Sequence, residues 1–225
     1  THSKSSTAVG SSINAGGKVN ITATGAGTDS NINVIGSDIY GGTATTLKAD
    51  NAINLLSAQS TTEEHTSNKS SGWNAGVAIS YGTSGFAFGI TAGGNVGKGR
   101  GEGESVTQAN THVGSGGLTT LESGGTTTIA GAQVTGKRVE VDAAALNIIS
   151  LQDTATYDSK QMDASAQVTV GYGFAASGSY SQSKINADYA SVGEQSGIIA
   201  GDGGYRVNVK GNTNLTGGIV TSSQS

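Results

Sequence analysis

A three-residue unit, apolar–Asn–apolar, recurs along the chain and constrains its fold more than any other sequence feature. The copies are Val19-Asn20-Ile21, Ile32-Asn33-Val34, Ile53-Asn54-Leu55, Leu146-Asn147-Ile148 and Val207-Asn208-Val209, with Val139-Glu140-Val141 as a variant. Side chains in a strand alternate between two faces, so each unit buries its two apolar residues and presents the central residue to water. The pattern therefore predicts many short strands.

A second motif, apolar-x-Gly-x-x-apolar or a near variant, follows some of these strands. It occurs at Ile35–Ile39, Ile129–Val134 and Leu215–Val220. Glycine at the bend permits a positive φ, which lets the chain turn a corner between two sides of a coil. Short strands alternating with such corners predict a solenoid in which each strand pairs with the coils before and after it.

The composition agrees with a thin core. Hydrophobic residues make up 34% of the chain and aromatic residues 5%, with 37 Gly and no Pro. A disordered chain usually combines low hydrophobicity with high net charge, whereas the net charge here is only -4 over 225 residues. A column filled by a few Ile, Val and Leu per coil needs little apolar material, because each buried side chain contributes about 1.5–3 kcal/mol.

A longer period indicates two large tandem units, the first with an extra leading portion. Asn54–Gln59 matches Asn147–Gln152 at an offset of 147 − 54 = 93 residues, and Ser80–Gly82 matches Gly171–Gly173 at 171 − 80 = 91. We therefore predict an all-β fold, a right-handed parallel β-helix (solenoid) with antiparallel β-hairpin insertions. The chain 1–225 is expected to be one β-helical segment of a larger protein. Stacked coils are expected over 13–59, 113–153 and 198–225, and Gly/Ser-rich hairpin insertions over 60–112 and 154–197.

The two insertions have the alternation of β-hairpins. In the first, apolar residues alternate over Trp73–Tyr81 and again over Phe86–Val96, with Gly82–Gly85 as the turn. The second repeats the plan more weakly, outward over Ala166–Tyr172 and back over Phe174–Tyr180. Together they hold the only Trp and all three Phe. The candidate membrane or partner contacts are Trp73, Val77, Ile79, Tyr81, Phe86, Phe88, Ile90, Val168, Val170, Tyr172 and Phe174.

Two interpretations of these apolar faces remain open. In one, they pack against the flank of the helix and cover its groove. In the other, they meet a partner or lipid, because strands of about 9–11 residues are long enough to cross an outer-membrane bilayer. A two-stranded ribbon alone would leave unpaired backbone groups in lipid, so several hairpins would have to combine.

No catalytic, cofactor-binding or metal site is predicted, and no cofactor is expected. Gly97–Gly101 departs from the phosphate-loop pattern and is expected to be a flexible turn. His2, His65 and His112 lack the spacing of a zinc site and are expected to be solvated.

Paired acids, of the kind a glycosidase uses, occur at Glu63-Glu64 and Glu102/Glu104, in Gly/Ser-rich insertion segments not expected to hold carboxyl groups rigidly. With no Cys, the chain has neither disulfides nor thiolate metal sites. With 12 Lys+Arg and a pI near 5.3, it has no basic footprint for nucleic acid. No run of 18 apolar residues and no signal-peptide pattern is found.

Three segments carry a family resemblance: Ser150–Gln161, Ala187–Ile198, and Ala200–Gly204 followed by Val207–Thr213. With them the chain resembles the haemagglutinin-repeat region of filamentous-haemagglutinin-like two-partner-secretion exoproteins. The likeness is greatest to the second repeat region of contact-dependent growth inhibition effectors, and it covers nearly the whole chain.

The resemblance implies a secreted, non-catalytic β-helical shaft at the bacterial cell surface, associated with the outer membrane. It also implies export through an outer-membrane two-partner-secretion transporter, and engagement of a target cell's outer membrane or surface receptor to help deliver a C-terminal toxin. One alternative is an adhesin that binds host or neighbouring cells. Another is a β-helical polysaccharide-degrading enzyme, which is disfavoured because the residues expected to stand out from the strands are mostly Asn and Thr, which are not acids or bases near neutral pH.

Overall fold

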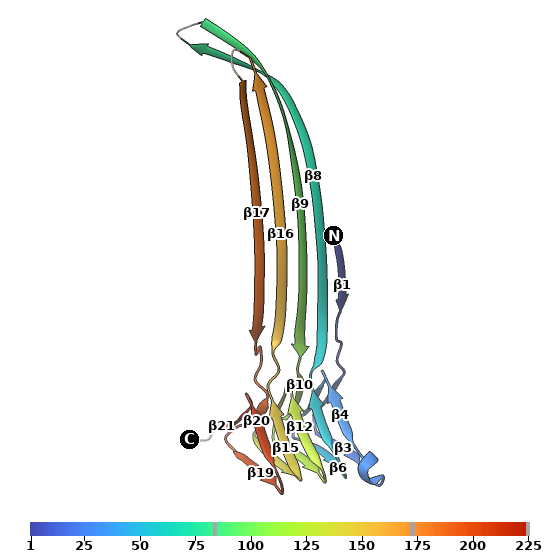
Figure 1. Ribbon diagram of the computed structural model, residues 1–225. Helices are drawn as coiled ribbons and strands as arrows, with labels where there is room; N and C mark the ends of the chain where they lie inside the picture. The colour runs from blue at the N-terminus through green and yellow to red at the C-terminus, as the bar shows by residue number, and fades with distance from the viewer. Residues whose placement is uncertain (83–84, 172–173, 224–225) are drawn as a thin grey trace. The chain divides into compact units, whose positions relative to one another are not determined.

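The computed structural model describes the backbone of residues 1–82, 85–171 and 174–223, and the side chains of these ranges except 78–82 and 85–88. The fold is all-β and contains both parallel and antiparallel sheets (Figure 1). Within these ranges the only helical segment is the 3-10 turn η1 (Gly27–Asp29), and no helix is long and apolar enough to cross a membrane. The chain divides into a coil unit (6–61, 106–154 and 190–225) and a hairpin unit (1–5, 62–105 and 155–189).

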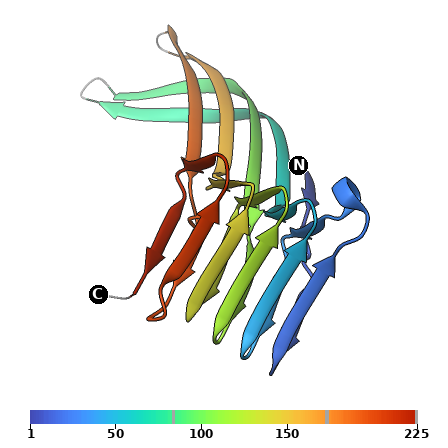
Figure 2. The same cartoon turned by 90° about the horizontal axis from the view of Figure 1, so that it is seen from below.

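The coil unit contains three parallel sheets, and each complete coil contributes one strand to each of them, with β21 as an additional strand of the first sheet (Figure 2). The first sheet consists of β2 (Ser12–Ala15), β5 (Asp38–Gly41), β10 (Thr111–Ser115), β13 (Ala132–Gly136), β18 (Gly197–Ala200) and β21 (Ile219–Ser222). The second consists of β3 (Lys18–Ala23), β6 (Ala44–Ala49), β11 (Leu118–Ser123), β14 (Arg138–Ala143) and β19 (Tyr205–Val209). The third consists of β4 (Ile32–Ile35), β7 (Ile53–Leu56), β12 (Thr126–Ala130), β15 (Ala145–Ile149) and β20 (Thr213–Thr216). In every sheet the strands lie in chain order, which confirms the predicted parallel β-helix.

Ladders of apolar side chains fill the column between the three sheets. In the second sheet one such ladder runs in register through Ile21, Leu47, Leu121, Val141 and Val207. The three central members of this ladder are completely buried. Each layer covers the apolar residues of the layer before it, so a few aliphatic side chains per coil are enough to exclude water.

The central residues of the triplets form ladders on the outside, as predicted. Asn54 Nδ2 donates to Asn33 Oδ1 at 2.8 Å, and Asn214 Nδ2 donates to Asn147 Oδ1 at 2.9 Å. The expectation that Thr also points outward is wrong at Thr119, which is completely buried. Its hydroxyl donates to the Thr135 carbonyl at 2.7 Å, so it satisfies a backbone oxygen at an inner corner, where an apolar side chain would leave it unpaired.

The corner between the third sheet and the first sheet has two alternative forms. Where β4, β12 and β20 lead directly into β5, β13 and β21, the corner contains Gly36, Gly131 or Gly217, with φ of 53°, 63° and 64°. A residue with a β-carbon rarely adopts this conformation, which explains the predicted Gly motif. After β7 and β15 the chain instead runs into a long hairpin. Hairpins therefore recur at every second coil, and two coils plus one hairpin make up the 93-residue offset.

The hairpin unit is one antiparallel sheet with the strand order β1-β8-β9-β16-β17 (Figure 1). Its strands are β1 (His2–Ser6), β8 (Ala58–Gly82), β9 (Gly85–Ala109), β16 (Asp153–Val170) and β17 (Phe174–Ser191). Both predicted hairpins are therefore present, and β9 of the first is hydrogen-bonded to β16 of the second. The sequence did not indicate β1, which pairs with β8 at the edge of the sheet.

Candidate functional site

The hairpin unit has two chemically different faces, and contacts around β9 show which residues share a face. A β-carbon built at Gly97 would lie 2.5 Å from both Ser70 Oγ of β8 and Asp163 Oδ1 of β16. Ser165 Oγ and Ser179 Oγ lie 2.8 Å apart across β16 and β17. Because side chains alternate along a strand, one face carries the even-numbered residues of β8 and the odd-numbered residues of β9, β16 and β17.

This polar face consists mainly of glycine and uncharged polar residues. It includes Asn68, Ser70, Asn74, Thr91, Asn95, Ser159, Gln161, Ser165, Gln167, Thr169, Ser177 and Ser179. A β-carbon at Gly99 would displace the amide groups of Asn68 and Gln161, which lie across β9 from either side. The glycines of β9 thus have no side chains on this face, and polar side chains of the neighbouring strands lie over their backbone.

The opposite face carries an apolar band on the part of the strands that leads toward the β8–β9 and β16–β17 connections. Its exposed members are Trp73, Val77, Ile90, Val96, Met162, Val168, Val170, Phe174 and Tyr180. Their side chains range from 38% exposed at Val168 to 86% exposed at Trp73. Alanines fill positions between them, so the band contains no charged residue among the described residues from 162 to 170 on this face.

Six of the eleven predicted contact residues have described side chains, and all six lie in the apolar band: Trp73, Val77, Ile90, Val168, Val170 and Phe174. The side chains of Ile79, Tyr81, Phe86 and Phe88, and the whole of Tyr172, lie outside the described residues. The predicted set omitted Val96, Met162 and Tyr180. The period-two pattern could have identified these three residues, because each is an even number of residues away from a predicted contact residue in the same strand.

A charged zone borders the apolar band on the same face. Within it, Arg100 Nε donates to Glu102 Oε1 at 2.9 Å, and His65 Nδ1 lies 3.3 Å from the same oxygen. The hydrogen bond and positive charge of Arg100 lower the pKa of Glu102, with a smaller contribution from His65. The predicted flexible turn at Gly97–Gly101 is wrong, because this segment lies within the regular strand β9. Its glycines face the polar side, and Lys98 and Arg100 face the charged zone.

The acid pairs also lie in regular strands. Glu63 and Glu64 are on opposite faces of β8, with Glu63 Oε2 3.9 Å from Lys4 Nζ, and Glu64 beside Gly103 on the polar face. These four acids therefore lie on a regular strand backbone. Glu102 and Glu104 instead share a face with Glu63, where Arg100 pairs with Glu102 and Lys4 lies near Glu63.

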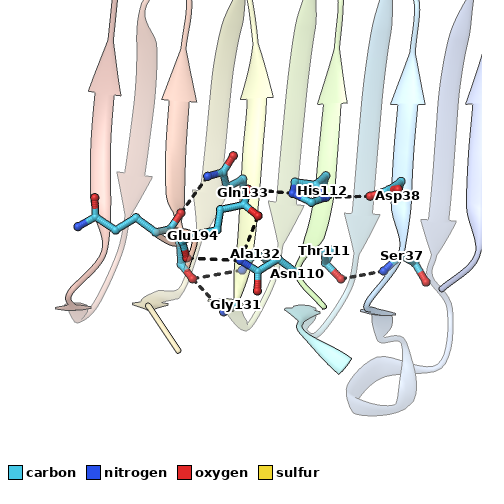
Figure 3. Close-up of polar contacts among 11 residues, drawn as sticks. Ser37, Asp38, Asn110, Thr111, His112, Gly131, Ala132, Gln133 and Glu194 are labelled. Atoms are coloured by element: carbon cyan, nitrogen blue, oxygen red, sulfur yellow. Dashed lines mark hydrogen bonds and ion pairs between the residues drawn. The ribbon is translucent and has the colours of Figure 1, made fainter. Parts of the chain in front are cut away.

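In the coil unit, His112 forms a cluster that joins three segments far apart in the sequence (Figure 3). Its Nδ1 lies 2.9 Å from Asp38 Oδ1 of β5, and its Nε2 lies 2.9 Å from Glu194 Oε1, in the segment between β17 and β18. Partial burial is the largest single influence and lowers the pKa of His112, but the hydrogen bonds and charges of the two carboxylates together raise it above its ordinary value. The expectation that His112 is simply solvated is wrong.

The same segment is tied to the first sheet by hydrogen bonds between side chains and backbone groups (Figure 3). The buried Ser196 accepts hydrogen bonds at its Oγ from the Gly131 and Ala132 backbone N–H groups, at 2.9 and 3.2 Å. Gln133 Nε2 donates to the Gln195 carbonyl at 3.0 Å. These contacts hold the returning chain in register with the next coil, so the cluster has a structural role.

A second set of charges converges on the outside of the second sheet. Arg206 donates to Glu140 at 3.2 Å and to Asp142 at 2.9 Å, while Arg138 Nε donates to Glu140 at 2.8 Å. Hydrogen bonds from Arg138 and Arg206 lower the pKa of Glu140, which keeps it ionised and unsuited to act as a general acid. Over the described residues, no group of three or more His, Cys, Asp or Glu side chains is arranged to hold a metal ion.

Comparison with known proteins identifies the family. The family model described as "Hemagglutinin repeat" matches residues 1–164 of the chain. The chain belongs to this haemagglutinin-repeat family. The match confirms the resemblance to haemagglutinin-repeat proteins that the sequence indicated. No solved structure matches the chain.

The haemagglutinin-repeat chain is similar to several CdiA proteins. It is 39% identical over 222 residues to the toxin CdiA of Escherichia coli, covering 95% of this chain and 7% of the relative. It is 41% identical over 227 residues to the 16S rRNA endonuclease CdiA of Enterobacter cloacae subsp. cloacae, covering 99% of this chain and 7% of the relative. It is 37% identical over 221 residues to the deoxyribonuclease CdiA of Yersinia pseudotuberculosis, covering 95% and 20%. The chain thus spans a small fraction of the relatives it matches.

Proposed function

We propose that this chain is a non-catalytic shaft segment of a large secreted exoprotein of the contact-dependent inhibition, toxin-delivery type. The parent protein would reach the bacterial cell surface through an outer-membrane two-partner-secretion transporter. The hairpin unit would then engage the outer membrane of a target cell through its apolar band. Similarity to CdiA toxins over nearly the whole chain supports the type of parent protein.

The proposal that the hairpin unit engages a membrane rests on the exposed apolar band. A contiguous apolar surface marks an interaction site or a membrane contact when it is larger than the scattered apolar residues of an ordinary surface. On β16 the band runs from Met162 to Val170, a length of about 26 Å at about 3.3 Å per residue. The hydrocarbon core of a bilayer is about 30 Å thick, so the dimension fits acyl chains. The sheet order pairs β9 and β16 on both sides, which satisfies their backbone groups, whereas the five-residue β1 lies beside β8 near Glu63 and not beside the apolar band.

The charged clusters support a non-catalytic role. A glycosidase needs two carboxyl groups on either side of the bond that it cleaves. Here an imidazole lies between Asp38 and Glu194, and two arginines bind Glu140 and Asp142. Each cluster is therefore internally paired, and its carboxylates serve to connect coils.

The test compares two adjacent residues on opposite faces of β16. Val170→Asp places a charge in the apolar band, and Thr169→Asp places the same charge on the polar face. In flotation with outer-membrane vesicles, Val170→Asp should weaken binding roughly tenfold or more, because transfer of a carboxylate into hydrocarbon costs a few kcal/mol. Thr169→Asp should bind as the wild type does.

Equal binding of all three proteins would contradict membrane engagement through this face. Binding of the wild type to intact cells but not to vesicles prepared from their lipids would instead indicate an adhesin that recognises a surface receptor.

A further inference from the structure

A row of cations crosses the hairpin unit beside the apolar band. The register that brings Ser165 and Ser179 together also sets Lys160 opposite Lys184, five residues further along each strand and on the other face. Arg100 of β9 lies next to them, since Arg100, Lys160 and Lys184 line one surface groove together with Glu102, Asp158 and Asn186. Three cations from three neighbouring strands therefore stand side by side.

Two more cations lie in the adjoining row. Ser70 and Asn68 of β8 approach Gly97 and Gly99 of β9 on the polar face. The residues between them, Lys69 and Lys98, are consequently opposite each other on the charged side. We name these five residues the basic belt: Lys69, Lys98, Arg100, Lys160 and Lys184.

The basic belt is unfavourable for the isolated sheet. Like charges directly opposite each other on neighbouring strands are destabilising. All five side chains are exposed, and among the residues that the structure describes none of the four lysines has a carboxylate oxygen within 4.0 Å. Only Arg100 is paired, with Glu102. The whole chain carries a net charge of -4, so the belt is a local concentration of positive charge and not a general surplus.

The position of the belt points to its ligand. Val96 precedes Lys98 by two residues on β9, and Met162 follows Lys160 by two residues on β16, so the belt adjoins the apolar band directly. The acidic residues Glu102 and Asp158 come one row further away. If the band lies against acyl chains, the belt lies at the depth of the lipid phosphates, about 7 Å along the strands from the nearest apolar residue. Ammonium and guanidinium groups bind phosphate oxygens with charge-assisted hydrogen bonds.

We propose that the basic belt binds the phosphate groups of anionic membrane lipids and so sets the depth at which the apolar band meets the bilayer. This inference rests on the proposed membrane contact. It adds a second, electrostatic component whose residues differ from those of the apolar band.

The experiment uses the whole chain and two kinds of vesicle, phosphatidylcholine alone and an equal mixture of phosphatidylcholine and phosphatidylglycerol. Lys160→Gln/Lys184→Gln should bind the mixed vesicles about 25-fold more weakly than the wild type, at about fivefold per cation. Its binding to phosphatidylcholine vesicles should be unchanged. The matched control, Lys18→Gln/Lys210→Gln, removes the same charge from exposed positions of the coil unit and should bind both vesicles as the wild type does.

The outcomes separate the two proposals. Equal binding of the wild type and Lys160→Gln/Lys184→Gln to mixed vesicles, or an equal loss in the control, overturns the phosphate site. Loss caused by the lysine variant but not by Val170→Asp overturns the apolar contact and leaves the belt. Absence of wild-type binding to either vesicle overturns both. Belt-dependent binding of a DNA oligonucleotide in preference to the vesicles would assign the belt to nucleic acid instead.

Discussion

His112 joins residues that are 74 positions before it and 82 positions after it in the chain. A protonated imidazole donates one hydrogen bond to Asp38 and one to Glu194, whereas a neutral ring has only one N–H to donate. Loss of the proton therefore leaves one ring nitrogen facing a carboxylate oxygen without a hydrogen between them. The hydrogen bonds of His112 to both carboxylates thus depend on the charge of its ring.

This cluster predicts how stability changes with pH. The pKa of His112 in the folded protein is raised above that of the unfolded chain, about 6.5. Its stabilising contribution is therefore complete below the unfolded pKa and is lost as the pH rises through the folded pKa. NMR titration of the imidazole should give a pKa above 6.5, and Asp38→Asn should lower it. Asp29→Asn, which removes a carboxylate elsewhere, should leave it unchanged, and a wild-type pKa at or below 6.5 would refute the bridge.

At the scale of single elements, each short strand inside the coil unit is stabilised by pairing with the strands of the layers on both sides. Strand β11 is paired with β6 and β14, and its Leu121 lies in register between Leu47 and Val141. No solvent reaches this side chain. A strand in this position contributes to two interfaces, so damage to it weakens two layers.

We expect Leu121→Ala to lower the free energy of unfolding by about 2–5 kcal/mol, because it leaves a cavity inside the ladder. Thr120→Ala, one residue earlier and on the outer face, should change it by less than about 1 kcal/mol. Urea denaturation followed by circular dichroism measures both. Similar losses for the two variants would show that Leu121 does not carry the packing of this layer.

Period-two patterns made the fold predictable from sequence, because both the triplets of the coils and the apolar positions of the hairpins repeat locally. Local composition gave a wrong prediction of a turn at Gly97–Gly101. Glycine at every second position is typical of a turn, but it also occurs in a strand that has no side chains on one face. The neighbours that distinguish the two, Asn68 and Gln161, come from other strands. The partners of His112 and the cation row at Lys160 and Lys184 likewise depend on register between distant segments.

At the scale of the whole molecule, hairpins and glycine corners are interchangeable ways of joining one coil to the next. Ala130 pairs with Ile149, and Gln133 pairs with Gly197, so Ser150 and Ser196 are the positional equivalents of Gly131 and Ala132. The second hairpin thus occupies the place of a single corner residue. The coils before and after it pair directly with each other, β13 with β18, β14 with β19 and β15 with β20.

This equivalence predicts that the second hairpin is removable. Replacing residues 150–195 by one glycine should preserve the coil unit, seen as a retained β-sheet circular dichroism spectrum and a cooperative unfolding transition. The same deletion with valine in place of glycine should be less stable by about 1–3 kcal/mol, because the corner needs a positive φ. An unfolded glycine variant would show that the hairpin is required for the coils to form.

Insertion at alternate coils has a further geometric consequence. Neighbouring layers of a β-helix and neighbouring strands of a sheet are both about 4.8 Å apart. Two hairpins that leave the coils two layers apart are therefore separated by about 9.6 Å, which is the width of two paired strands. The spacing of the residues from which successive hairpins start thus equals the width of one two-stranded hairpin. This agrees with the pairing of β9 and β16 as neighbours in the sheet. A hairpin on every layer would crowd its neighbours, and one on every third layer would leave a missing strand between them. Each further repeat of two coils and one hairpin would add two strands to the hairpin sheet for every two layers of the coils.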